Sequence, residues 1–115
     1  MAFVAVSESG GVVEEVGAAR YTKNQVSGVH ELELFLSDEY RGTRLAHAMA
    51  EMIFNYAKAH YIPSLTLKEM DYNTDARKLA DEFDMSVRLN PDKAHEVLYT
   101  KILGDYDGFL VKNAG

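Results

Sequence analysis

Hydrophobic residues are grouped in short stretches along the first part of this chain. Phe3–Val6 is a short apolar run and Val12–Thr22 is a longer one that is broken by Gly17. The Ser/Gly-rich segment Ser7–Gly11 between them has the composition of a hairpin loop, so the two runs predict an antiparallel hairpin. A second polar loop is expected at Thr22–Gly28. The stretch Val29–Leu36 then places its leucines on one side and its glutamates on the other, which predicts a half-buried strand.

After Ser37–Gly42 the hydrophobic period changes to that of a helix. Apolar residues recur at three- and four-residue steps, and we expect them to pack against the rest of the protein: Leu45, Met49, Met52, Ile53 and Tyr56. The opposite face is polar and carries His47, Glu51, Asn55 and Lys58. Pro63 ends this helix or its tail, because proline has no backbone N–H to donate.

The second half of the chain contains further strands and one further helix. Ser64–Glu69 is a short predicted strand, and Asn73 is placed to cap a helix whose buried stripe is Ala76, Leu79, Ala80 and Phe83. Val87–Leu89 and Glu96–Leu103 predict two more strands. Residues 104–115 show no periodicity, so we expect them to form a C-terminal tail to a domain of residues 1–103.

The order of these elements predicts an α/β (α+β) fold. A strand, a helix and a strand follow one another between Val29 and Glu69, and such a crossover implies a parallel pair. The flanking strands favour antiparallel pairing. We therefore expect a mixed, mostly antiparallel sheet with a central parallel pair and two main helices.

Composition and charge exclude several classes of protein. Hydrophobic residues make up 47% of the 115 residues and charged residues 26%, which are ordinary values for one globular domain. The absence of cysteine excludes disulfides and thiolate nucleophiles, and the histidines lack ligand spacing, so we expect no metal. No apolar run is long enough for a membrane span, and Met1–Val6 is too short for a secretory signal, which favours a cytoplasmic protein. The net charge of −6 argues against nucleic-acid binding.

The turn Tyr40–Ala46 carries the strongest candidate chemistry, because a strand there runs into the start of a helix. Backbone N–H groups in the first turn of a helix have no partner within it, and they favour an anion such as phosphate. Gly42 allows a tight turn, Thr43 adds a hydroxyl donor, and Arg41 and Arg44 supply cationic donors. The alternative is an ordinary exposed loop with two solvated arginines.

The residues around this turn resemble the acetyl-CoA-binding core of the GCN5-related N-acetyltransferases (GNAT family). In that family the turn has the pattern Gln/Arg-x-x-Gly-x-Gly/Ala, and here the sequence is Arg41-Gly42-Thr43-Arg44-Leu45-Ala46. The preceding Asp38-Glu39-Tyr40 and the later segment from Asn73 to Met85 are similar to those of the bacterial protein-lysine acetyltransferase branch. The resemblance covers roughly residues 3–103 and implies an acyl-CoA N-acyltransferase fold.

The resemblance implies an N-acyltransferase that moves an acetyl group from acetyl-CoA to an amine, with a protein lysine as one candidate acceptor. Acetyl-CoA would lie in a splay between the strands Val29–Leu36 and Ser64–Glu69, with its pantetheine arm along Leu34, Phe35 and Leu36. Its pyrophosphate would lie on Arg41, Gly42, Thr43, Arg44, Leu45 and Ala46. Asn73 would cap its helix, reach the coenzyme, or do both.

By the same resemblance, Glu31 occupies the position of the general base in the protein-lysine branch. Glu33, two residues on, faces the same side and could substitute for Glu31 or raise its pKa by like-charge repulsion. The alternative is that both carboxylates belong to the solvent-facing side of an alternating strand.

Three departures from the family pattern bear on activity. Arg44 replaces the first glycine of the turn, where it would either clamp phosphate or fill the site. Asp84 and Met85 replace a Gly-Phe pair, and Asp can adopt the left-handed conformation that glycine would take. A strand and two helices that cover the family's acceptor site have no counterpart here, so we expect a truncated fold whose site a homodimer or a host protein completes. A catalytically degenerate coenzyme A-binding regulatory or interaction module is the alternative function.

Overall fold

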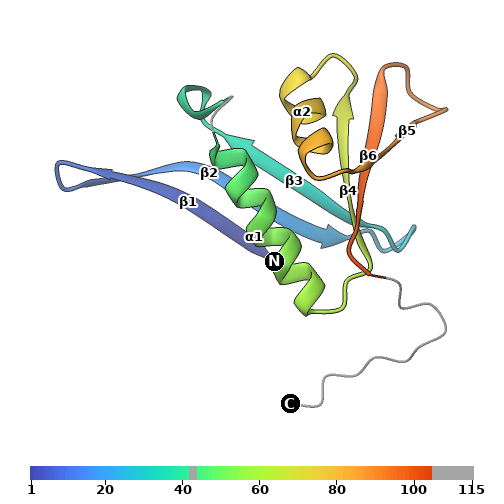
Figure 1. Ribbon diagram of the computed structural model, residues 1–115, viewed down its shortest axis with the longest axis horizontal. Helices are drawn as coiled ribbons and strands as arrows, with labels where there is room; N and C mark the ends of the chain where they lie inside the picture. The colour runs from blue at the N-terminus through green and yellow to red at the C-terminus, as the bar shows by residue number, and fades with distance from the viewer. Residues whose placement is uncertain (42–43, 105–115) are drawn as a thin grey trace.

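The computed structural model describes residues 1–41 and 44–104, which form a six-stranded sheet and two α-helices (Figure 1). The elements follow in the order β1 (Ala2–Ser9), β2 (Val12–Lys23), β3 (His30–Leu36), α1 (Leu45–Ala59), β4 (Ser64–Met70), α2 (Thr74–Glu82), β5 (Ser86–Leu89) and β6 (Glu96–Ile102). A short 3-10 helix, η1 (Asp38–Tyr40), lies between β3 and α1. The predicted order of elements is confirmed, apart from η1, which the hydrophobic pattern does not predict.

The sheet has the strand order β1-β2-β3-β4-β6-β5. Among its neighbouring pairs in the described residues, β3 and β4 are parallel and the others are antiparallel. This is the predicted mixed sheet with a central parallel pair. β1 and β2 join at a tight turn through Gly10 and Gly11, both with positive φ, so the hairpin loop is shorter than the expected Ser7–Gly11.

Both helices pack on the same face of the sheet (Figure 1), and the core lies between them and the strands. Gly17 on β2 allows α1 to approach this face closely. A Cβ at that position would lie 2.9 Å from the Phe35 carbonyl oxygen and 3.1 Å from Met49 Sδ. A larger residue would therefore push α1 away from the strands that it covers.

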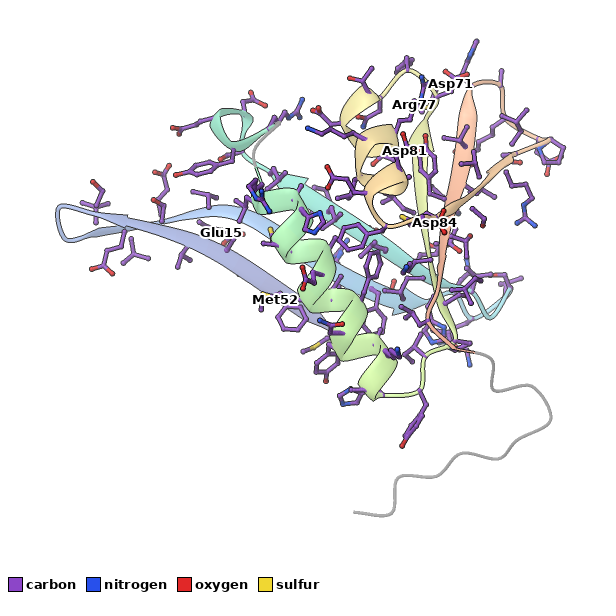
Figure 2. All side chains as sticks on the ribbon, viewed as in Figure 1. Glu15, Met52, Asp71, Arg77, Asp81 and Asp84 are labelled. Carbon is purple, nitrogen blue, oxygen red and sulfur yellow. The ribbon has the colours of Figure 1, made fainter. Side chains whose placement is uncertain are left out.

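One expected core residue of α1 lies on the surface. Met52 projects from the helix with 55% of its surface exposed (Figure 2). Around the helix, Met52 lies about 100° to one side of the buried Ile53, and Phe54 lies about 100° to the other side. The buried side of α1 includes Phe54 but not Met52. The expectation that Met52 fills the core is therefore wrong, because the hydrophobic period alone does not fix which edge of the apolar arc faces the sheet.

The C-terminal half follows the sequence closely. Asp84 has a φ of 52°, the left-handed conformation expected for it. Of the tail expected at 104–115, only Gly104 is among the described residues, and its N–H donates to the Pro63 carbonyl at 3.3 Å. The boundary at residue 103 stays a prediction.

Two further findings concern only residues 1–41 and 44–104. No helix in this part of the chain is long and apolar enough to cross a membrane. In the same residues, no group of three or more His, Cys, Asp or Glu side chains is placed to hold a metal ion.

Candidate functional site

The parallel strands β3 and β4 are paired only near the start of β3. Their register joins Glu31 to Thr66 and Leu32 to Leu67, whereas β3 continues to Leu36 paired with β2 alone among the described residues. The two strands therefore diverge toward their C-terminal ends (Figure 1). The parallel pair is thus open on the side where α1 begins.

A cavity of about 220 Å³ lies where the strands diverge. Six residues that the sequence assigns to coenzyme binding line it: Leu34, Phe35, Leu36, Arg41, Ala46 and Asn73. The other lining residues, which the sequence did not single out as a site, are Leu67, Glu69, Asp75, Ala76 and Leu79. They come from β4 and α2, so the cavity is walled by elements on both sides of the parallel pair.

The edge of β3 along this cavity offers backbone hydrogen-bonding groups. Ser37, just after β3, donates its N–H to the Val16 carbonyl of β2 at 2.9 Å. Backbone groups of successive strand residues point to alternate sides, so those of Leu34 and Leu36 point away from β2, toward the gap beside β4. An extended ligand can pair with these groups as a further strand would.

The turn between β3 and α1 brings two arginines to this region. Arg41 lines the cavity of about 220 Å³, and its Nε lies 3.3 Å from Asp38 Oδ1 in an exposed ion pair. Arg44 is the N-cap residue of α1 and has φ −72° and ψ −4°, so its position does not require the backbone freedom of glycine. The predicted contacts of Gly42 and Thr43 lie outside the described residues.

A second cavity, of about 320 Å³, adjoins the first one between α1 and α2. The two share four lining residues: Leu36, Ala46, Asp75 and Leu79. Arg44 and Lys78 give the second cavity its cationic groups, and Asp75 and Glu82 its carboxylates. His47 also lines it, with Nδ1 2.6 Å from Glu82 Oε2. Leu45, the first residue of α1, packs against the hydrophobic core. The start of α1 therefore presents cationic side chains to both cavities.

Asn73 uses both ends of its side-chain amide inside the protein. Its Oδ1 accepts from the Ala76 N–H at 3.1 Å, which confirms the predicted cap of α2. Its Nδ2 donates to Glu69 Oε2 at 3.0 Å. The contact with the coenzyme stays a prediction.

Glu31 lies on the face of the sheet opposite the helices, where β3 and β4 are still paired. Its Oε1 lies 3.1 Å from Lys68 Nζ on β4 and accepts from Asn24 Nδ2 at 3.3 Å. The hydrogen bond from Lys68, and then the one from Asn24, lower the pKa of Glu31 below its ordinary value, against the opposing effect of partial burial. The side chain of Glu31 is 27% exposed. Glu31 is therefore a partly exposed carboxylate whose ionised form is stabilised by its neighbours.

The rise in the pKa of Glu31 that was expected from Glu33 is not observed: Lys68 and Asn24 lower the pKa, and Glu33 is not among the groups that shift it. Arg20 Nε donates to Glu33 Oε2 at 2.7 Å, so the charge of Glu33 is paired within the protein. Lys68 is the important neighbour that sequence reasoning missed. Only the register between β3 and β4, which pairs Glu31 with Thr66, could have revealed it.

Comparisons with known proteins agree with this arrangement. Residues 2–85 match the model of the acetyltransferase (GNAT) family, whereas no curated protein matches the sequence significantly. Among solved structures, yncA from Salmonella typhimurium, solved with its cofactor acetyl-CoA, is 15% identical with a TM-score of 0.72, and the match covers 97% of this chain and 69% of that one. An N-acetyltransferase from Staphylococcus aureus Mu50 is 19% identical with a TM-score of 0.67, covering 86% of this chain and 66% of the other.

The GNAT domain of S. lividans PAT is also similar, at 17% identity and a TM-score of 0.68, covering 83% of this chain and 57% of that one. This chain thus spans between 57% and 69% of the length of these three solved proteins. At such identities the likeness shows a shared acyl-CoA N-acyltransferase fold, while the family match itself spans more than half of the chain. The chain therefore belongs to the acetyltransferase (GNAT) family, which uses acetyl-CoA.

Proposed function

We propose that this chain provides the coenzyme-binding and proton-accepting parts of an N-acetyltransferase that moves an acetyl group from acetyl-CoA to an amine, with a lysine of a protein as the acceptor class. The divergence of β3 from β4 is the observation that carries the proposal. It leaves a cavity of about 220 Å³ along an open strand edge, beside the start of a helix. A cavity with a free backbone edge along β3 and with Arg41 in its lining fits an extended thioester that ends in a diphosphate.

In this proposal the pantetheine arm pairs with the backbone of Leu34 and Leu36 and lies against Phe35. The diphosphate lies at the segment from Arg41 to Ala46, where the N–H groups of the first turn of α1 and the two arginines neutralise its charge. Arg44 clamps phosphate from the side of the second cavity, which it lines. Asn73 positions this wall of the site through its cap of α2.

The acceptor amine approaches on the face of the sheet that carries Glu31. The carboxylate of Glu31 takes a proton from the incoming ammonium group, and the neutral nitrogen then attacks the thioester carbonyl carbon. The new C–N bond replaces the C–S bond, and coenzyme A leaves as the thiolate. The hydrogen bonds from Lys68 and Asn24 keep Glu31 ionised, although its low pKa makes it a weak base.

We propose that a second copy of the chain or a host protein completes the acceptor side, in a cytoplasmic setting. None of the described helices covers the face of the sheet that carries Glu31, which leaves room for such a partner. The segments Asp38–Tyr40 and Asn73–Met85, which resemble those of the protein-lysine acetyltransferase branch, support a protein lysine as the acceptor class.

A ligand titration tests the binding half of the proposal. Acetyl-CoA, coenzyme A and an unrelated nucleotide are added separately while the thermal stability of the protein is followed. A ligand at 100 times its Kd should add about 2.7 kcal/mol to the free energy of unfolding. The proposal expects this shift with both coenzymes and not with the nucleotide, and no shift with either coenzyme would contradict it.

A non-catalytic coenzyme A-binding module is the second candidate function. The ion pair between Glu31 and Lys68 favours it, because a carboxylate already paired with an ammonium group is a poor base. The two candidates differ in turnover, since both bind coenzyme but only the enzyme transfers acetyl to added amines. Arg44→Gly then tests the turn: weaker coenzyme binding would mean that Arg44 clamps phosphate, and tighter binding that it obstructs the site.

A further inference from the structure

Lys68 places a primary amine of the chain itself at the proposed base. Its Nζ lies 3.1 Å from Glu31 Oε1, and its side chain is 51% exposed. Lys68 comes directly after Leu67, the last residue of β4 that pairs with β3. Its neighbours on both sides, Leu67 and Glu69, line the cavity of about 220 Å³. The amine therefore lies beside the base at the point where the two strands begin to diverge.

We propose that Lys68 is an acceptor of this transferase: the chain acetylates its own Lys68 in cis, from acetyl-CoA bound between β3 and β4. The inference rests on the acetyl transfer proposed above and names a modification site for it. Among the described lysines, Lys68 is the one that the structure pairs with Glu31, and reach to the base is the first geometric requirement for proton transfer. Among the described residues, the other ion pair made by a lysine, between Lys93 and Glu96, lies at the β5–β6 loop.

The proposed step balances in atoms and protons. The Lys68 ammonium group gives one proton to Glu31, and the neutral Nζ attacks the thioester carbonyl carbon. A C–N bond forms and the C–S bond breaks. The nitrogen loses its second proton to the leaving thiolate, so the products are acetyl-Lys68 and free coenzyme A, and Glu31 returns its proton to water.

The modification changes the base as well as the acceptor. Lys68 is the largest cause of the lowered pKa of Glu31, and acetylation removes its positive charge. Asn24, which also donates to Glu31, is neutral, and so are Thr22 and Thr66, which lie across from Glu31 on β2 and β4. The next carboxylate along β3, Glu33, is already paired with Arg20. Acetyl-Lys68 therefore lets the pKa of Glu31 rise toward its ordinary value, which strengthens it as a base for a second acceptor.

Peptide mapping by mass spectrometry tests the inference. The purified chain is incubated with acetyl-CoA, and acetylation of Lys68 is followed in time against that of Lys93. Lys93 is the matched control, because it is an exposed lysine paired with a carboxylate at 3.9 Å and reports direct chemical acetylation. We expect Lys68 to react about 100-fold faster than Lys93, the size of a general-base contribution, at a rate independent of protein concentration.

Two variants complete the test. Lys68→Arg keeps the positive charge and should abolish the rapid acetylation while coenzyme binding persists. Lys68→Gln, which removes the charge as acetylation does, should move the acid limb of the pH–rate profile for added amines to higher pH than in Lys68→Arg. Acetylation of Lys68 no faster than that of Lys93, or a rate that rises with protein concentration, would overturn the inference.

The thermal titration keeps the two proposals distinguishable. If neither coenzyme shifts the unfolding transition, the proposed function fails and the inference fails with it. If acetyl-CoA binds and added amines are acetylated while Lys68 stays at the rate of Lys93, the function stands and the self-acetylation of Lys68 alone is refuted.

Discussion

The two halves of β3 belong to one seven-residue strand, but they differ in their pairing with β4, in the burial of their side chains and in their contact with the cavity. In the first half, Glu31 and Leu32 pair with β4, Leu32 is buried, and the carboxylate of Glu31 is held by Lys68. In the second half, the segment from Leu34 to Leu36 has lost β4 as a partner and borders a cavity. We call the first half, which is paired with β4, the closed half, and the second, which is not, the open half.

One strand can therefore offer both a carboxylate in a fixed position and an unpaired backbone edge for a ligand. The closed half is fixed by buried leucines on one face and by an ion pair on the other, which suits a group that must hold its position. The open half leaves backbone groups and half-buried side chains exposed to a ligand, which suits an extended coenzyme. Ala76 and Leu79 of α2 line the cavity between the two strands. The divergence of the strands is therefore part of the way in which α2 packs against the sheet.

The largest expected effect separates chemistry from binding. Glu31→Gln removes the proposed base in the closed half and should lower acetyl transfer to amines by about 100- to 10,000-fold. Coenzyme binding, assigned to the open half, should stay within the error of the titration. Glu14→Gln, on the exposed part of the hairpin, is the control for loss of a carboxylate. Equal turnover of Glu31→Gln and the wild type at every pH would remove Glu31 from the mechanism.

The closed half should also carry more stability than the open half. Leu32→Ala empties a position that is only 3% exposed and should lower the free energy of unfolding by about 2–5 kcal/mol. Leu36→Ala, at a half-buried position beside the cavity, should cost clearly less. Urea unfolding of both variants measures the difference, and similar losses would mean that the two halves are packed alike.

Removing a cation from the open half should weaken binding. Arg41→Ala should reduce the affinity for coenzyme A by an amount equivalent to about 1.5–3 kcal/mol, because it loses charge-assisted hydrogen bonds to the diphosphate. Acetylated pantetheine, which lacks the diphosphate, should bind both proteins equally. Arg20→Ala, whose guanidinium pairs with Glu33, is the matched control. Calorimetric titration compares them, and an unchanged affinity in Arg41→Ala would remove Arg41 from the phosphate site.

The wall of the cavity depends on a helix cap. Asn73→Ala loses the hydrogen bond to the Ala76 N–H and should lower the free energy of unfolding by about 1 kcal/mol. Asn73→Ser, which retains a cap, should recover most of that loss. Thermal unfolding of the two variants distinguishes capping from other roles, since no difference between them would show that the cap contributes little.

The smallest expected effect is the pH dependence of the Glu31–Lys68 pair. The pKa of Glu31 is lower in the folded than in the unfolded state, so its contribution is present above the unfolded pKa and is lost as pH falls through the folded pKa. The ion pair is partly exposed, so Lys68→Met should cost less than about 1 kcal/mol at neutral pH. This cost should shrink with acidification, and a cost that grows instead would contradict the assigned sign.

Much of the fold could be predicted because its signals are local. The period of two in Val29–Leu36, the helical period after Gly42, and the Asn73 cap each depend on residues a few positions apart. The role of the turn from Arg41 to Ala46 rests on the resemblance to the GNAT family and stays a prediction. Predictions failed where a decision depended on packing between distant elements, as for Met52, which one helix period cannot distinguish from a core position.

From the sequence come the strands and α-helices, their order, the parallel pair and six of the residues that line the cavity of about 220 Å³. The resemblance to the GNAT family implies a splay between these two strands, but only the tertiary structure shows that β3 and β4 separate after Leu32, because this depends on how α1 and α2 pack against the sheet. The tertiary structure alone also decided that Lys68 meets Glu31, 37 positions away in the sequence, because strand register joins residues that no local pattern connects. Contacts between residues that are distant in the sequence therefore decide both which half of β3 is open and which half is paired.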